Sequence, residues 1–127
     1  MQENHLFEYA VIRVVPRVER EEFLNVGIVL YCRKPVFLET IYSLDEERLR
    51  ALYADIDIDQ LREYLKAFAL IAAGDANGGP IAKLDAASRF RWLTATRSTI
   101  IQTSKVHPGF CAEPRKTAKK LFEEFVG

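Results

Sequence analysis

The sequence predicts a single α+β domain over residues 1–127: a mostly antiparallel sheet of about four strands, with helices packed chiefly on one face. Two patterns favour this fold. Short apolar segments with alternating side chains fill the first third of the chain, and apolar residues at spacings of three and four recur through much of the rest. The composition, 49% apolar and 28% charged residues, is that of an ordinary folded domain. At 127 residues the chain is also long enough to bury a core without metals or disulfides.

Residues 25–33 are expected to form the central strand, because this segment is apolar on both faces. In a regular strand, three residues point to one face: Val26, Ile28 and Leu30. Val29 and Tyr31 then point to the other face. Gly27, inside the same strand, indicates a bulge or the close approach of a neighbouring element.

Further strands are predicted on both sides of this segment. Residues 8–15 alternate strongly, with Arg13 as the odd polar member, and Pro16 ends them. A short turn leads into a strand over 36–42, and the β-prone run 99–103 is the fourth strand. His107-Pro108-Gly109 is expected to turn the chain.

Helices are predicted where the apolar period changes. Ser43, three residues before Glu46, is typical of a capping box and predicts a short helix that ends near Tyr53. Asp57 begins the clearest helix, and Gly74 ends it. A third helix is expected over 85–96, and a terminal helix begins at Pro114.

The composition favours a cytoplasmic protein. No apolar run approaches the roughly 20 residues of a membrane span, and the N-terminus lacks the basic and apolar segments of a secretory signal. Cys32 and Cys111 are interpreted as two inert thiols. Neither they nor the two histidines show metal-ligand spacing, so no metal and no cofactor are predicted.

Catalytic candidates are weak. His107 lies three residues after Ser104, but the segment has no glycine-flanked nucleophile and no oriented carboxylate. We interpret His107 as a turn residue rather than a general base. Asp55, Asp57 and Asp59 alternate like a calcium loop, but that loop needs a glycine and a glutamate where this chain has Gln60 and Lys66.

The strongest functional signal is basic and polar. Residues 76–127 hold 9 basic and 4 acidic side chains. A ligand site is predicted from six residues that can bind phosphate or carboxylate: Arg13, Asn25, Arg89, Arg97, Ser98 and Gln102. A wider patch for an anionic partner comprises Arg91, Lys105, Arg115, Lys116, Lys119 and Lys120. Phe90 and Trp92 could add a stacking surface.

A structural interpretation stands beside this functional one. Arg89 and Arg97 could instead pair with the acidic region 45–63, while the neighbouring aromatic side chains simply pack. Arg13 could be an edge-exposed or internally paired arginine.

Several motifs together resemble a bacterial family of unknown function. The segments that carry the resemblance are 9–16, Glu22-Phe23-Leu24-Asn25-Val26-Gly27, Arg89-Phe90-Arg91-Trp92-Leu93, 98–104 and Leu121-Phe122. In this order they resemble the family catalogued as domain of unknown function 3037. The resemblance implies no activity. It does imply a role in binding a partner, because proteins of this family are associated with being encoded beside a kinase-like protein of the toxin–antitoxin type.

We therefore expect a non-enzymatic adaptor that binds a protein partner, with a kinase-like protein as one candidate. The alternative is a protein that binds nucleic acid or a phosphorylated ligand through residues 89–120. A third alternative is an enzyme of unfamiliar class with a site around Arg97, Ser98, Gln102, Ser104 and His107.

Overall fold

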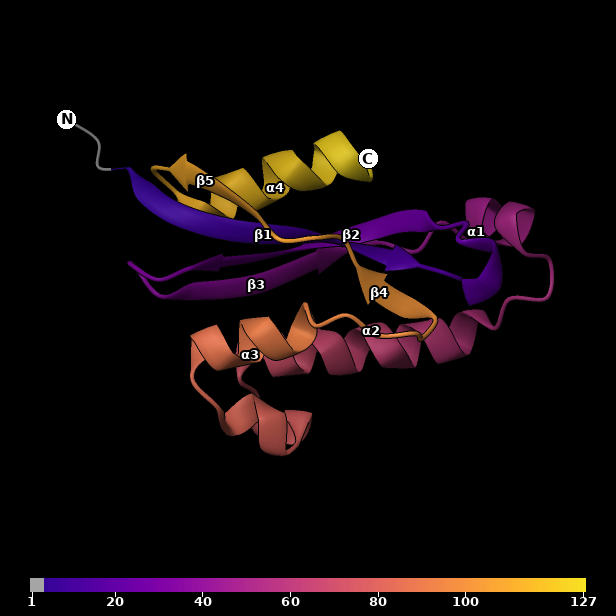
Figure 1. The fold of residues 1–127 in the computed structure, drawn as a ribbon, viewed down its shortest axis with the longest axis horizontal. Coiled ribbons are helices and arrows are strands. Elements are labelled where there is room, and N and C mark those ends of the chain that lie inside the picture. Colours follow the sequence, from indigo (N-terminus) through magenta and orange to yellow (C-terminus); the bar gives the residue numbers. More distant parts are fainter. Residues whose placement is uncertain (1–3) are drawn as a thin grey trace.

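The computed structural model describes residues 4–127, which form a five-stranded antiparallel sheet with helices on both faces (Figure 1). The strands are β1 His5–Val14, β2 Leu24–Cys32, β3 Phe37–Tyr42, β4 Ile101–Thr103 and β5 His107–Cys111. β3, β2 and β1 lie side by side, and β4 and β5 both pair with the remaining edge of β1. The predicted α+β class is confirmed.

The helices form two layers. Their bounds are α1 Glu46–Leu52, α2 Ile58–Ala73, α3 Ala86–Leu93 and α4 Pro114–Phe125, with 3₁₀ turns η1 Val18–Arg20, η2 Ala76–Gly78 and η3 Pro80–Lys83. α2 and α3 cover one face of the sheet, and α4 covers part of the other (Figure 1). Two apolar clusters fill the spaces between these layers. Leu61 and Leu65 of α2 belong to the larger one, and Ala118 of α4 belongs to the smaller one.

A bulge interrupts the pairing of β1 with β2. Ile12 lies opposite Gly27, whereas the next residue, Arg13, lies opposite Asn25. The extra residue is Val26, which is buried in the α2-side cluster. The expectation that Val26 shares a face with Ile28 is therefore wrong, because the bulge inserts one residue and shifts the alternation of β2.

Gly27 lies where β3 leaves no room for a side chain. A Cβ atom placed on it would be 2.6 Å from the Ile41 carbonyl oxygen and 2.8 Å from Tyr42 Cβ. Both reasons proposed for this glycine, a bulge and a close approach, are thus present.

The segment 107–111 is a strand rather than the predicted turn. It pairs with the first half of β1, with His107 opposite Tyr9 and Pro108 opposite Glu8. β5 lies at an edge of the sheet and pairs only with β1. An edge strand tolerates proline, because its outward-facing N–H groups have no neighbouring strand to bond to. The prediction of a turn was wrong because it used only the local preference of Pro108 and Gly109, whereas pairing with β1 makes the segment extended.

The predicted helix boundaries are largely confirmed. Asp57 and Asp85 cap their helices by accepting hydrogen bonds from the backbone N–H groups of Gln60 and Ser88. Gly74 ends α2 with a φ of 69°. At α1 the cap is Asp45 rather than Ser43, and α3 ends at Leu93, earlier than predicted.

Across residues 4–127, none of the helices combines the length and apolar character that crossing a bilayer requires.

Candidate functional site

Three of the predicted ligand residues lie in one row across the sheet. Arg13 of β1 is directly opposite Asn25 of β2 on one side and Gln102 of β4 on the other. Residues directly opposite one another share a face of the sheet. This is the face that carries α4, because Val11, two residues before Arg13 in β1, packs in the same cluster as Ala118. We call Arg13, Asn25 and Gln102 the polar row.

Arg13 is a cation without an anionic partner. Its guanidinium carbon lies 4.0 Å from the ring centre of the half-exposed Phe23, and within residues 4–127 no carboxylate lies at ion-pair distance from it. The Arg13 Nε atom is buried without an acceptor among the described residues, although Arg13 as a whole is partly exposed. Burial lowers the pKa of the Arg13 guanidinium.

Asn25 is held beside Arg13 in a fixed orientation. Its Nδ2 donates to the backbone carbonyl of Phe125, in the last turn of α4, at 3.3 Å. Flipping the amide would place two oxygens against each other, so this bond sets the position of Oδ1. Asn25 Oδ1 is buried and accepts no hydrogen bond within the described chain. A buried polar atom without a hydrogen-bond partner lowers stability by about 1–3 kcal/mol. Arg13 Nε and Asn25 Oδ1 are both such atoms, so both destabilise the folded state.

Gln102 completes the row at the sheet edge. Its Nε2 donates to the carbonyl of Thr99 at 2.8 Å, which holds the amide against its own strand. Gln102 is partly exposed, as are Arg13 and Asn25. Each residue of the row therefore keeps some contact with solvent, although Arg13 Nε and Asn25 Oδ1 are themselves buried.

Ser104 and His107 lie near this face but do not form a catalytic pair. Ser104 Oγ accepts a hydrogen bond from the Val11 N–H at 2.8 Å and donates to the Lys105 carbonyl at 2.9 Å. The His107 ring lies against Tyr9, with 5.5 Å between the ring centres. A serine nucleophile needs a base within hydrogen-bond reach, whereas this hydroxyl bonds to the backbone instead.

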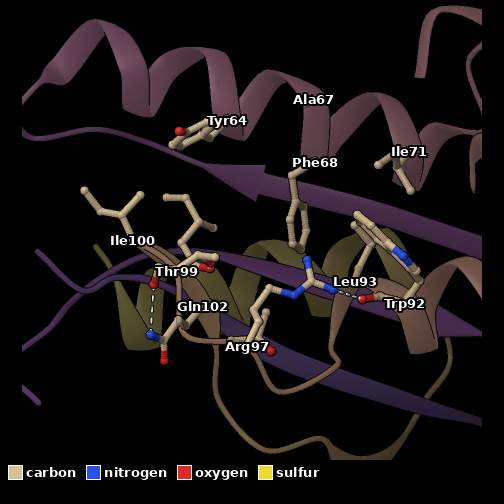
Figure 2. A pocket seen from close by; sticks show the side chains of 12 residues that line it. Tyr64, Ala67, Phe68, Ile71, Trp92, Leu93, Arg97, Thr99, Ile100 and Gln102 are labelled. Carbon is tan, nitrogen blue, oxygen red and sulfur yellow. Dashed lines mark hydrogen bonds between the residues drawn. The ribbon is translucent and has the colours of Figure 1, made fainter. Parts of the chain in front are cut away.

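A pocket that shares Gln102 with the polar row lies between α2 and the segment that joins α3 to β4 (Figure 2). Its volume is about 360 Å³. Its walls are mostly apolar: Tyr64, Ala67, Phe68, Ile71, Trp92, Leu93, Ile100 and Ile101, with Arg97, Thr99, Gln102 and Thr103 completing the lining. We call this the α2–α3 pocket.

Arg97 places one cation in the α2–α3 pocket. Its guanidinium lies 4.5 Å from the centre of the Trp92 ring and donates a hydrogen bond to the Trp92 carbonyl (Figure 2). No carboxylate in the described part of the chain forms an ion pair with it. The hydroxyl of Tyr64 accepts from Gln60 Nε2 at 3.0 Å. The pocket thus offers apolar walls and a positive charge, which suits binding rather than acid–base chemistry.

Arg89 has a structural position. Its Nη1 donates to the carbonyls of Ile71 and Ala72 at 3.2 and 2.6 Å, and its Nε donates to the Leu84 carbonyl at 2.9 Å. Two of these acceptors, the carbonyls of Ile71 and Ala72, lie in the last turn of α2, where carbonyls lack a full set of partners within the helix. Arg89 therefore bonds to backbone oxygens rather than to the acidic region. Ser98 is exposed and lies in the connection between the α3 and β4 segments.

The basic residues of 89–120 do not form one surface. Arg91 lies on α3, on one side of the sheet, and Arg115 to Lys120 lie on α4, on the other (Figure 1). Arg115 pairs with Glu39 at 2.6 Å, and Lys116 pairs with Glu113 at 2.8 Å. Lys105, Lys119 and Lys120 are exposed. The charge asymmetry of the sequence is thus divided between two faces.

A more open hollow of about 960 Å³ lies at the other end of the sheet. The exposed Leu6 lines it, and its walls carry charges of both signs, with Glu8 and Asp85 beside Arg33 and Arg91. Among residues 4–127, no group of three or more His, Cys, Asp or Glu side chains is placed to hold a metal ion.

Sequence reasoning identified Arg97 and Gln102 but not the pocket beside them. The α2 wall, Tyr64, Ala67 and Phe68, follows the helical stripe that covers the sheet. A clue was present in the width of that stripe, because Tyr64 extends it beyond what the sheet alone needs.

A family model described as "Protein of unknown function (DUF3037)" matches residues 9–126. Neither the curated proteins nor the solved structures contain a match to this chain.

Proposed function

Because the chain belongs to the DUF3037 family, whose description assigns no activity, we propose its function from the site geometry: a non-enzymatic adaptor that binds a protein partner through the α2–α3 pocket. The partner segment presents an apolar side chain next to a carboxylate. The observation that carries this proposal is an apolar pocket whose lining includes Arg97, which forms no ion pair within residues 4–127.

The pocket has the size and chemistry of an anchor site. A volume of about 360 Å³ accommodates a large apolar side chain. Buried aromatic or aliphatic anchors dominate the energy of many protein interfaces, and Trp and Arg are enriched at such points. A carboxylate beside the anchor would meet the Arg97 guanidinium, which Trp92 holds in place by stacking.

The arrangement of cations favours this function over nucleic-acid binding. A track for a phosphate backbone needs several unpaired cations on one surface. Here Arg115 and Lys116 are ion-paired, and Arg91 lies across the sheet from them. A kinase-like partner, which the family resemblance implies, is one candidate for the protein that docks here.

The test is affinity capture with pocket variants. Tagged wild-type protein, Ala67→Arg and Arg97→Gln are incubated with nuclease-treated lysate of the source organism, and bound proteins are identified by mass spectrometry. Ala67 is exposed on α2, so its replacement fills the pocket without disturbing the core. Ala76→Arg, exposed in η2 and outside the pocket, adds the same charge as a control.

A stoichiometric protein retained by the wild type and the control but lost from both pocket variants would support the proposal. The segment of that protein protected from proteolysis should then contain an apolar residue beside Asp or Glu. A partner retained equally by the pocket variants, or capture of nucleic acid alone in samples without nuclease, would overturn it.

A further inference from the structure

We infer that the partner segment lies in the α2–α3 pocket as an extended strand, which pairs with the outer edge of β4 and adds one strand to the sheet. This binding mode rests on the proposed adaptor function and deepens it, because it assigns a conformation and a set of backbone contacts to the segment that docks.

The α2–α3 pocket runs along an edge of β4 rather than across one of its faces. Ile101 is buried in the α2-side cluster, whereas Gln102, opposite Arg13, points to the side of the sheet that carries α4. Both residues line the pocket. The two faces of a strand meet at its edges, and β1 occupies one edge of β4, so the pocket lies along the other. Tyr64 and Phe68 of α2 stand across from this edge (Figure 2).

Backbone groups at this edge of β4 lack partners. The Ser104 N–H donates to the Val11 carbonyl of β1 at 2.8 Å. Because successive residues of a strand direct their backbone groups to opposite sides, Ile101 and Thr103 direct theirs away from β1. Within residues 4–127, the Ile101 N–H and both backbone groups of Thr103 form no hydrogen bond, and the Ile101 carbonyl accepts only from the Thr99 hydroxyl. A peptide strand supplies the matching donors and acceptors.

An added strand would also direct its side chains into the pocket. A strand at this edge continues the sheet, so every second side chain points toward α2 and its apolar wall. The guanidinium of Arg97, stacked on Trp92, belongs to the same lining and can bind a carboxylate of the segment. A helix in this position would bond its own backbone groups internally and leave those of β4 unpaired. The charge and the free backbone groups together favour an extended segment that carries a carboxylate.

Peptide selection on the wild-type protein identifies segments that bind. Short random peptides are displayed in two libraries, one with a free C-terminus and one followed by a polar linker. Enrichment in the first library alone indicates a terminal carboxylate, and enrichment in both indicates Asp or Glu. We expect the enriched peptides to bind the wild type and to lose binding to Arg97→Gln and to Ala67→Arg.

Thr103→Pro tests the backbone contact. Proline removes the N–H that faces away from β1 and places ring atoms there, but it removes no bond between β4 and β1. Peptide binding should weaken at least about 10-fold, the combined effect of a lost hydrogen bond and the steric block. Thr40→Pro is the matched control, because Thr40 holds the corresponding outward position in β3, at the opposite edge of the sheet. It should leave peptide binding unchanged.

Two measurements on the wild type probe the same contact without altering the protein. Hydrogen exchange followed by NMR should show that the bound peptide slows exchange of the Ile101 and Thr103 amides. N-methylation of alternate peptide nitrogens should abolish binding in one register and spare it in the other, as strand pairing requires.

Full binding by a folded Thr103→Pro protein would overturn the added strand and leave the adaptor function intact. Tolerance of N-methylation in both registers, with unchanged exchange at Ile101 and Thr103, would do the same. Enrichment of no peptide that depends on Arg97 would also overturn the added strand, while the lysate capture decides the adaptor function separately.

Discussion

Arg13 lies directly opposite Asn25, and this pairing exists because the β1–β2 register slips by one residue between Ile12 and Arg13. The slip leaves a buried donor on Arg13 and a buried acceptor on Asn25, each without a partner among the described residues. A fold selected for stability alone would remove such a pair.

Replacing Arg13 by methionine should therefore maintain or raise stability. The change removes a partly desolvated cation and keeps most of the apolar stem, while the stacking on Phe23 that it loses is worth about 0.5–1 kcal/mol. We expect the free energy of unfolding, measured by urea denaturation, to stay within about 1 kcal/mol of wild type or to increase. A loss of more than about 2 kcal/mol would show that Arg13 is a structural residue.

Replacing Gly27 by alanine should be strongly destabilising. The added Cβ would lie 2.6 Å from the Ile41 carbonyl oxygen, and backbone atoms of a neighbouring strand cannot move away cheaply. Overpacking of this kind costs about 1–3 kcal/mol, measurable as a lower midpoint of urea unfolding. A Gly27→Ala protein as stable as the wild type would contradict the close approach of β3.

Replacing Arg89 by alanine should lower stability without affecting partner capture. Three backbone carbonyls at the end of α2 and before α3 would lose a charged donor. Bonds to charged groups contribute about 1.5–3 kcal/mol each and are not additive, so we expect a total loss of about 2–4 kcal/mol in urea unfolding. Arg89→Lys should recover only part, because a single ammonium cannot reach all three carbonyls with the planar geometry of arginine. Loss of the partner from a folded Arg89→Ala protein would assign Arg89 to the binding surface instead.

The sequence predicted the elements well where one local signal was sufficient. The period of α2 and its caps at Asp57 and Gly74 are local properties, and both agree with the structure. The alternation of β1 likewise placed Ala10, Ile12 and Val14 on one face.

The remaining features depend on partners distant in sequence. β5 is a strand because Tyr9 and Glu8 of β1 pair with it, although Pro108 and Gly109 by themselves favour a turn. The polar row needs the register of three strands, and the α2–α3 pocket needs the distance between α2 and Trp92. Charge along the chain was also a poor guide to surface charge, since α3 and α4 lie on opposite faces.

The two cysteines should be unreactive in the folded protein and should not form a disulfide. Both are buried and free. Cys32 lies opposite Phe7 on one side of β1, and Cys111 lies opposite His5 on the other. Two strand spacings alone separate their Cα atoms by about 9.5 Å, and the offset from Phe7 to His5 along β1 adds to this, so the distance exceeds the roughly 7 Å that a disulfide can bridge.

Burial also raises the pKa of the Cys32 thiol, so the reactive thiolate is scarce at neutral pH. An aromatic disulfide reagent should therefore modify almost no thiol in native protein at pH 7.5 and both thiols in denaturant. Because the folded pKa is raised, the protonated thiol favours the native state at neutral pH, and this contribution is lost as the pH rises through the folded pKa. Stability of the wild type relative to Cys32→Ala should consequently fall in alkaline solution. Rapid labelling of the native protein would instead mean that β5 opens readily from β1, since that is the route to Cys111.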